Sequence, residues 1–278
     1  MSKSTSRMFH LFDQQFHEAR RIFNSLAKNF KSKKAMDLKE KLVFINVFLH
    51  LISKIHFTKE ESLKFEPFNP FLALCKALNR IHHYKSSVAA YAAAKAGDHT
   101  AYDSYDRFLA AIKEEAYGEV DQVVRATPPT IWDELYATAF DYTRATGPLM
   151  IDTATSKLIS EEIENIGFPE EGSLDSHSIN EITEALRTVT LVENIRIALG
   201  LNPVYTAFIH GEMGKLNRVL QKWYQNHLFA QHLNHFFSEK EQVSPKYLDL
   251  AKAIKGRKLS LTQQVETLST NLFSKVAV

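Results

Sequence analysis

The sequence is poor in the residues that interrupt helices, with nine glycines and eight prolines among 278 residues. A β sandwich or barrel needs many turns, and turns normally draw on glycine and proline. The scarcity therefore disfavours such a fold and favours long helices. Hydrophobic residues make up 45% of the chain, which is enough to fill a core without covalent or metal cross-links.

Cysteine and long apolar runs are also nearly absent. Cys75 is the only cysteine, so no disulfide can form within the chain, and its apolar neighbours at 71–74 lead us to expect it to be buried. The N-terminus lacks the features of a signal peptide. The most apolar run, residues 42–52, covers about half of the ~20 residues that a membrane span needs. We therefore expect a cytoplasmic protein with no membrane contact, in which this run belongs to a buried core helix.

Motifs for catalysis and metal binding are missing as well. His227, His232 and His235 lie close in sequence, but no carboxylate accompanies them at metal-ligand spacing. No Glu-x-x-His pair of a di-iron bundle occurs, and the segment 211–215 has the wrong spacing for a phosphate loop and is expected to be helix or turn. We predict no enzyme activity, no catalytic residue, no metal and no cofactor.

What the chain does have is helical periodicity. Between its prolines and glycines, apolar residues recur at intervals of three and four, as on a helix with one buried face. Asp98 and Asp175 are suitable N-caps, because a short acceptor side chain satisfies first-turn amides. The pattern predicts an all-α protein with helices over 7–31, 37–57, 69–95, 101–125, 130–145, 149–165, 175–199, 204–237 and 246–275.

A faint internal repeat suggests two helical units. An offset of 142 places Leu78, Arg80 and Lys85 over Leu220, Lys222 and His227. Any two amphipathic helices can be slid until their apolar stripes agree, so chance similarity remains the alternative. We expect two pseudo-repeated four-helix units of long amphipathic helices, over 1–147, with an extra leading helix, and over 148–278, within one continuous domain. The acidic loop 168–175 is the clearest candidate boundary.

Charge is distributed unevenly although the net charge is only +2. Residues 1–58 carry 11 Lys and Arg against 4 Asp and Glu, residues 59–97 carry 6 against 3, residues 98–186 carry 5 against 19, and residues 187–278 carry 12 against 6. Basic ends therefore flank an acidic middle. This division is consistent with a patch for an anionic ligand and equally with solvated faces of opposite sign.

Several basic and imidazole residues recur at helical spacing on the flanks of apolar helices. Lys215 and Arg218 are three residues apart, and Arg218 and Lys222 are four apart, so they share a helix face. Such rows can line a groove for a phosphate chain, although plain solvation of the helix surface is the alternative. The candidate anion-binding residues are Lys39, Lys41, Arg80, His82, Lys85, Arg187, Lys215, Arg218, Lys222 and His227.

The layout of these helices resembles the CHAD family, the conserved-histidine α-helical domain. The segments 20–28, 78–85 and 220–227 lie where its two four-helix units would place them. The resemblance implies binding of inorganic polyphosphate in a basic channel, with Lys41, Arg80, Arg187 and Lys222 at matching positions. Leu38 and Asn180 replace the motif histidines. An alternative placement keeps a His-x-x-Arg pair as His17 and Arg20 but alters the spacing to Arg80, so this chain resembles a divergent member.

We therefore expect a non-enzymatic, anion-binding helical module, with polyphosphate or another phosphate-rich polymer as partner. The alternative is a helical protein-interaction scaffold with no anionic ligand. Nucleic-acid binding is less favoured, because the net charge is small and no recognised motif for it occurs.

Overall fold

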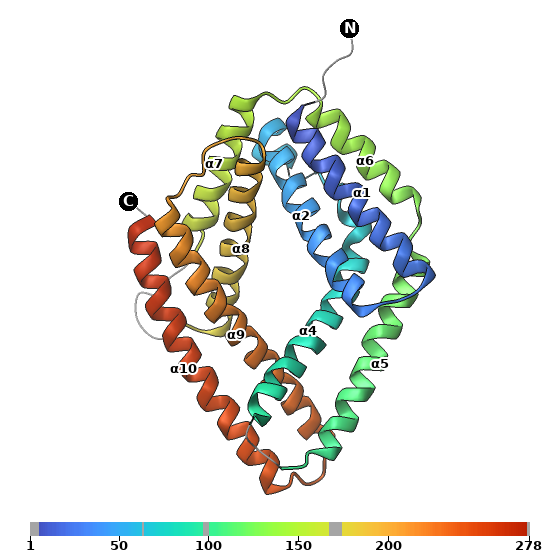
Figure 1. The fold of residues 1–278 in the computed structure, drawn as a ribbon, viewed down its shortest axis with the longest axis vertical. Helices are drawn as coiled ribbons and strands as arrows, with labels where there is room; N and C mark the ends of the chain where they lie inside the picture. Colours follow the sequence, from blue (N-terminus) through green and yellow to red (C-terminus); the bar gives the residue numbers. More distant parts are fainter. Residues whose placement is uncertain (1–5, 63, 97–99, 167–173, 277–278) are drawn as a thin grey trace. The chain divides into compact units, whose positions relative to one another are not determined.

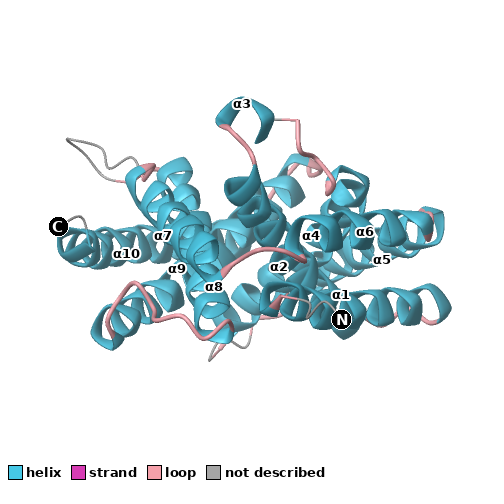
Figure 2. Cartoon of the chain, turned by 90° about the horizontal axis from the view of Figure 1, so that it is seen from above, coloured by secondary structure: helices cyan, strands magenta, loops and turns pink. Residues whose placement is uncertain are grey.

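Every regular element in the described part of the chain is helical, which confirms the all-α prediction (Figures 1 and 2). The computed structural model describes residues 6–62, 64–96, 100–166 and 174–276. The helices are α1 (Arg7–Lys28), α2 (Ser32–His56), α3 (Lys59–Ser62), α4 (Leu72–Lys95), α5 (Asp103–Ala126), α6 (Thr130–Thr143), α7 (Pro148–Glu164), α8 (Ser176–Ala198), α9 (Ala207–Ser238) and α10 (Pro245–Val276), with a 3₁₀ turn η1 (Asn69–Phe71). The nine helices expected from the sequence correspond to the nine long helices within these described ranges, where α3 and η1 are the elements that were not expected separately.

Two helix starts show why the local sequence folds in this way. Asp175 accepts a hydrogen bond from the Ser178 backbone N–H at 2.8 Å, which confirms it as an N-terminal acceptor for α8. Ser6 caps α1 in the same manner through the Phe9 N–H at 3.2 Å. The other expected cap, Asp98, lies outside the described residues.

The chain forms two compact units that differ from the consecutive halves expected on either side of residue 147. Unit 1 comprises Met1–Asn79, Tyr117–Asn165 and Ala185–Val204, and unit 2 comprises Arg80–Ala116, Ile166–Glu184 and Tyr205–Val278. The difference arises because α4, α5 and α8 each contribute residues to both units. Most of the acidic loop expected as a boundary, residues 167–173, lies outside the described residues.

Unit 1 is built around aromatic side chains on α1, α2 and α6, and Figure 1 shows these helices together. Phe12, Phe16, Phe48 and Trp132 are fully buried. The ring centroids of Phe12 lie 5.4 Å from Phe16 and 5.3 Å from Phe48, and Phe16 lies 5.6 Å from Trp132. The apolar run at 42–52 lies within α2 and supplies six buried side chains, so its prediction as a core helix is confirmed.

A buried arginine joins α7 to the end of α8 in unit 1. Arg196 is 5% exposed, and its Nη2 donates to the Asp152 carboxylate at 2.6 Å. Its Nη1 donates to Thr155 Oγ1 at 2.6 Å and Ser156 Oγ at 3.0 Å, and its Nε donates to the Asn202 carbonyl at 2.9 Å. Because each guanidinium nitrogen has an acceptor, the charge is buried without an unmet hydrogen bond.

Hydrogen bonds to residues of α8 hold the turn that follows this helix. Gly200 has φ of 81°, a left-handed conformation that glycine adopts without strain, and the Leu201 N–H donates to the Arg196 carbonyl at 2.9 Å. Both carboxylate oxygens of the buried Glu193 accept from the Val204 N–H, at 3.0 and 3.1 Å.

Unit 2 is organised by the long pair α9 and α10, which pack along each other (Figure 1). Its aromatic cluster includes Tyr91, Tyr105, Phe229, Phe236 and Tyr247. The Tyr105 ring lies 5.0 Å from Tyr91 and 5.3 Å from Phe236 between centroids. The segment 211–215 is an ordinary part of α9, as its poor match to a phosphate loop suggested.

Across the described ranges, no helix combines the length and apolar character needed to cross a bilayer.

Cys75 is half-buried where full burial was expected. Burial still raises the pKa of the Cys75 thiol to about 11, although the Lys39 charge acts in the opposite direction, so this thiol is a poor nucleophile at neutral pH.

Candidate anion-binding site

Three of the predicted cations already pair with carboxylates. In unit 1, Lys41 Nζ lies 2.7 Å from Glu18 Oε2 and also donates to Gln15 Oε1 at 2.7 Å. This pairing lowers the pKa of Glu18, first through the Lys41 hydrogen bond. In unit 2, Arg80 binds Glu115 at 2.8 Å and Lys215 binds Glu212 at 2.6 Å. A partnered cation attracts an added anion less strongly, so these three residues are weaker candidates than their sequence spacing implied.

The two predicted imidazoles belong to packed ring clusters in unit 2. His227 stacks on Trp223 with ring centroids 4.8 Å apart and planes within 9°. Burial lowers the pKa of His227, and the Lys258 charge lowers it further. His82 stacks on Tyr224 at 6.0 Å, and Tyr224 in turn hydrogen-bonds His83 at 2.9 Å. Rings held in this way contribute to packing of unit 2.

The remaining predicted residues divide into two kinds. Lys39 of α2 and Arg187 of α8 are half-buried in unit 1 and have other interactions. Lys85, Arg218 and Lys222 form no hydrogen bond or ion pair with any residue that the structure describes, and Arg218 and Lys222 are exposed on α9. The predicted set is therefore distributed over both units, three residues in unit 1 and seven in unit 2.

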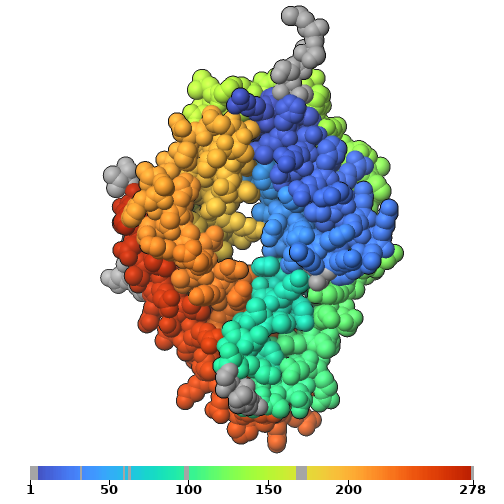
Figure 3. Space-filling view, in the orientation of Figure 1, coloured from blue at the N-terminus to red at the C-terminus, as the bar shows by residue number. Residues whose placement is uncertain are grey.

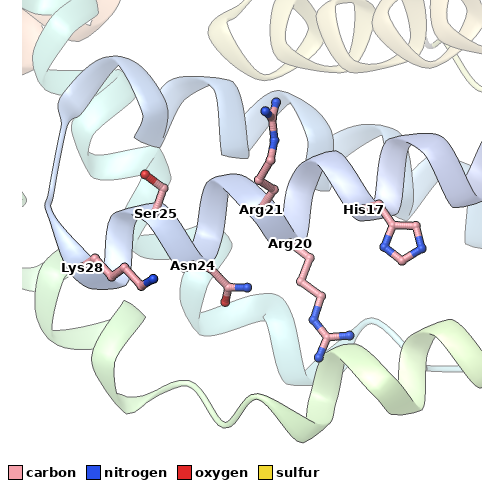
Figure 4. A pocket seen from close by; sticks show the side chains of 6 residues that line it. All are labelled: His17, Arg20, Arg21, Asn24, Ser25 and Lys28. Atoms are coloured by element: carbon pink, nitrogen blue, oxygen red, sulfur yellow. The ribbon is translucent and has the colours of Figure 1, made fainter.

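A basic hollow lies on α1 in unit 1, and none of the residues that line it belongs to the predicted set. Its volume is about 480 Å³, and Figure 4 shows the six α1 side chains that line it: His17, Arg20, Arg21, Asn24, Ser25 and Lys28. In the space-filling view, α1 lies at the surface (Figure 3, dark blue). This α1 hollow combines three cations, one imidazole and two neutral polar groups.

Helical spacing places these six side chains on one face. They recur at intervals of three and four from His17 to Lys28, which keeps them on the side of α1 opposite its buried residues. The buried stripe runs through Phe12, Phe16, Ala19 and Phe23. Packing of this stripe into unit 1 therefore orients the polar face outward.

The cations of the α1 hollow differ in how far they are neutralised. Arg20 Nη1 lies 2.7 Å from Asp133 Oδ1. Arg21 and Lys28 are exposed and form no hydrogen bond or ion pair with a described residue, although the Arg21 charge contributes to the lowered pKa of Glu18. Lys34 of α2 donates to Ser25 Oγ at the edge of the hollow. Arg21 and Lys28 thus retain their donors for an added anion.

His17 is oriented by its own helix and by α6. Its Nε2 lies 3.1 Å from Asp13 Oδ1, and the Tyr136 hydroxyl donates to the same oxygen at 2.7 Å. Burial, the hydrogen bond to Asp13 and the Asp13 charge together raise the pKa of Tyr136 to about 12. Tyr136 therefore stays protonated and holds the carboxylate in place.

The sequence contained a signal for this site. His17 and Arg20 form the His-x-x-Arg pair of the alternative family placement, and Arg21 and Lys28 continue the same face. Spacing alone did not distinguish this face from the basic row on α9, because a hollow depends on what neighbouring elements leave open.

Unit 1 also contains a smaller hollow of about 270 Å³, between α2 and residues 65–72. Its lining mixes Asn46, His50 and Glu66 with the apolar Leu49 and Phe68, so it offers no concentration of charge. Among the described residues, no three His, Cys, Asp or Glu side chains are grouped to hold a metal ion.

No protein-family model, curated protein or solved structure matches the chain.

Proposed function

We propose that this chain is a non-enzymatic, anion-binding helical protein whose ligand is inorganic polyphosphate or another phosphate-rich polymer. The observation that carries the proposal is the α1 hollow, which Arg21 and Lys28 line together with His17 and Arg20, and in which Arg21 and Lys28 form no hydrogen bond or ion pair with a described residue. Guanidinium groups bind phosphate oxygens through paired donors, and lysine adds a mobile point charge. The exposed Arg218 and Lys222 on α9 are secondary contacts in this proposal.

The same proposal makes the chain a divergent CHAD family member in the cytoplasm. Its support is the helix layout, the His17 and Arg20 pair, and the single cysteine, which suits a reducing compartment.

A direct test is polyphosphate binding as a function of salt. Binding through several phosphate contacts should weaken steeply as salt rises, with a slope of roughly 0.7 to 0.9 per contact on logarithmic axes. The double variant Arg21→Gln, Lys28→Gln should reduce that slope by about one to two. Titration calorimetry at several salt concentrations measures it.

The matched control removes two lysines from unit 2. Lys252 and Lys255 are exposed on α10 and form no ion pair with a described residue, so Lys252→Gln, Lys255→Gln changes the net charge equally. The control should leave the slope close to that of the unaltered chain. Absence of binding at low salt, or equal losses in the two double variants, would overturn the proposal.

A helical interaction scaffold is the second candidate. It is favoured by the exposed apolar start of α7, where Leu149 is 78% exposed and Met150 is 44% exposed. A scaffold predicts a protein complex that survives high salt and that Leu149→Ser weakens, with no polyphosphate binding.

A further inference from the structure

Lys258 of α10 is packed against an aromatic ring inside unit 2. Its side chain is half-buried, and its Nζ lies 5.3 Å from the centroid of the Trp223 ring on α9. Trp223 is 1% exposed, and its indole N–H donates to Thr262 Oγ1 at 3.0 Å, one turn further along α10. The indole is therefore fixed against the segment of α10 that carries Lys258.

No carboxylate in the described part of the chain pairs with the Lys258 ammonium. Its Nζ donates to Ser176 Oγ, on the first residue of α8, at 3.1 Å. The neighbouring Asp175 is engaged elsewhere, because its Oδ1 accepts from both the N–H and the hydroxyl of Ser178 at 2.8 Å. Lys258 is thus a half-buried cation whose hydrogen-bond partner among the described residues is a neutral hydroxyl.

These surroundings favour the neutral amine. Removing an ammonium from water without a counter-ion disfavours its charged form, and burial accordingly lowers the pKa of Lys258. The face of Trp223 acts in the opposite direction, because an aromatic ring attracts a cation. His227 stacks on Trp223, and the Lys258 charge lowers the pKa of His227, so the two groups repel each other when both are protonated. The net direction is a larger neutral fraction than an exposed lysine has, which is the condition for a nucleophilic lysine.

The position of Lys258 also limits which electrophile it takes. A half-buried amine beside an indole ring admits a small, uncharged molecule more readily than a bulky or charged one. Carbon dioxide is of this kind, and it reacts with the neutral form of an amine. The product is an anionic carbamate. A serine hydroxyl both accepts and donates, so Ser176, whose Oγ lies 3.1 Å from the nitrogen, can turn its hydrogen toward a carbamate oxygen.

We propose that Lys258 is a carbon dioxide site, where the amine becomes a carbamate that the Ser176 hydroxyl stabilises. The inference goes beyond the proposed function and is independent of it, because neither residue lines the α1 hollow. In the reaction, the Nζ lone pair attacks carbon and an N–C bond forms. One C–O π bond breaks, its electron pair stays on oxygen, and the nitrogen loses one proton to solvent. The step is balanced without an oxidant, a metal or a leaving group.

The test traps carbamates on the full chain. The protein is equilibrated with isotope-labelled bicarbonate and carbon dioxide near neutral pH, carbamates are alkylated with a trialkyloxonium salt, and each lysine peptide is quantified by mass spectrometry. Lys252 and Lys255 are matched controls, because they are exposed on the same helix and form no ion pair with a described residue. We expect trapping at Lys258 to exceed that at either control several-fold. Equal trapping at all three lysines would overturn the proposal.

A second comparison separates a carbon dioxide site from a lysine that is merely nucleophilic. Ser176→Ala removes the hydroxyl that donates to the carbamate, so the carbamate occupancy of Lys258 should fall several-fold. Acetylation of Lys258 by acetic anhydride gives a neutral amide and should be at least as fast in this variant as in the unaltered chain. Ser260→Ala, at an exposed serine of α10, should change neither quantity. Circular dichroism checks that both variants keep their helices.

The outcomes differ for each part of the inference. Preferential acetylation of Lys258 without carbamate trapping would overturn the carbon dioxide site, since the amine would then be reactive but unable to hold the product. Unchanged carbamate occupancy in Ser176→Ala would overturn the site as proposed, because the product would not depend on the Ser176 hydroxyl. Failure of the anion-binding proposal is detected separately, by the salt titration of the glutamine variants.

Discussion

The basic face of α1 in unit 1 and the basic row of α9 in unit 2 have similar spacing but different surroundings. On α1, Arg21 and Lys28 line a hollow together with His17. On α9, Lys215 is bound to Glu212 and Arg218 is exposed. The comparison teaches that spacing puts cations on one face, whereas neighbouring carboxylates and the shape of the surface decide whether that face can bind an anion.

A second comparison concerns buried polar groups, Arg196 in unit 1 and two histidines in unit 2. In unit 1, every guanidinium nitrogen of the buried Arg196 has an acceptor. In unit 2, His227 Nδ1 and His232 Nδ1 are buried without a hydrogen-bond partner among the described residues. We therefore expect the stability of unit 1 to depend on single charged contacts such as those of Arg196. We expect the stability of unit 2 to depend on the protonation of these two histidines.

The first way to sharpen this comparison is to remove Arg196. Arg196→Ala leaves the acceptors on Asp152 and Asn202 without their donor, and we expect a loss of about 3 kcal/mol in the free energy of unfolding. The measurement is urea unfolding followed by Trp132 fluorescence in a Trp223→Phe background, because each unit contains one of the two tryptophans.

Arg218→Ala is the control for that experiment. Arg218 is exposed and has no hydrogen bond or ion pair with a described residue, so its removal should change stability by less than about 0.5 kcal/mol. A cost for Arg196→Ala as small as that of the control would show that the buried network contributes little.

The second prediction concerns pH. Burial is the first cause that lowers the pKa of both His227 and His232, and charges of Lys258 and of neighbouring histidines add to it. The unfolded chain then binds more protons than the folded one just below the ordinary histidine pKa of about 6.5, so stability is full above that pH and falls as pH decreases through it.

We expect unit 2 to lose on the order of 1 kcal/mol between about pH 7.5 and about pH 5.5. Trp223 fluorescence during urea unfolding, in a Trp132→Phe background, measures the change. Unit 1 has one histidine of this kind, His50, whose pKa is lowered first by burial, so its pH dependence should be shallower. A unit 2 that is equally stable at both pH values would contradict the account, and His232→Gln should flatten its slope.

The third and smallest effect comes from releasing a cation on α9. Glu212→Gln removes the carboxylate that binds Lys215 at 2.6 Å, so polyphosphate affinity should rise by about twofold at low salt, with the gain disappearing as salt screens the charge. A rise much larger than this would indicate that the α9 row, and not the α1 hollow, is the principal anion site. Titration calorimetry at low and high salt measures it.

The sequence predicted the helices well because their signals are local. Proline, glycine and N-caps such as Asp175 mark helix boundaries, and the buried stripe of α1 follows directly from periodicity. The division into units was harder, because α4, α5 and α8 each serve both. The apolar periodicity of these three helices is the same on both sides of the boundary between the units, so the sequence pattern does not mark that boundary.

The candidate site was predicted only in part, for a physical reason. Lys41, Arg80 and Lys215 have the spacing expected of ligands, but each of them pairs with a carboxylate, Glu18, Glu115 and Glu212 respectively. Two of these carboxylates, Glu18 and Glu115, belong to other helices, so sequence spacing gives no direct information about them. The Arg196 network was missed for the same reason, since its acceptors lie on α7 and in the turn after α8.

The most direct measurement of the central claim compares two exposed arginines, one in each unit. Arg21 in the α1 hollow and Arg218 on α9 are both exposed and form no ion pair with a described residue. Modification by phenylglyoxal, quantified for each arginine with and without tripolyphosphate, reports which one the anion covers. The account predicts that tripolyphosphate protects Arg21 and leaves Arg218 reactive, whereas equal protection of both, or protection of Arg218 alone, would contradict it.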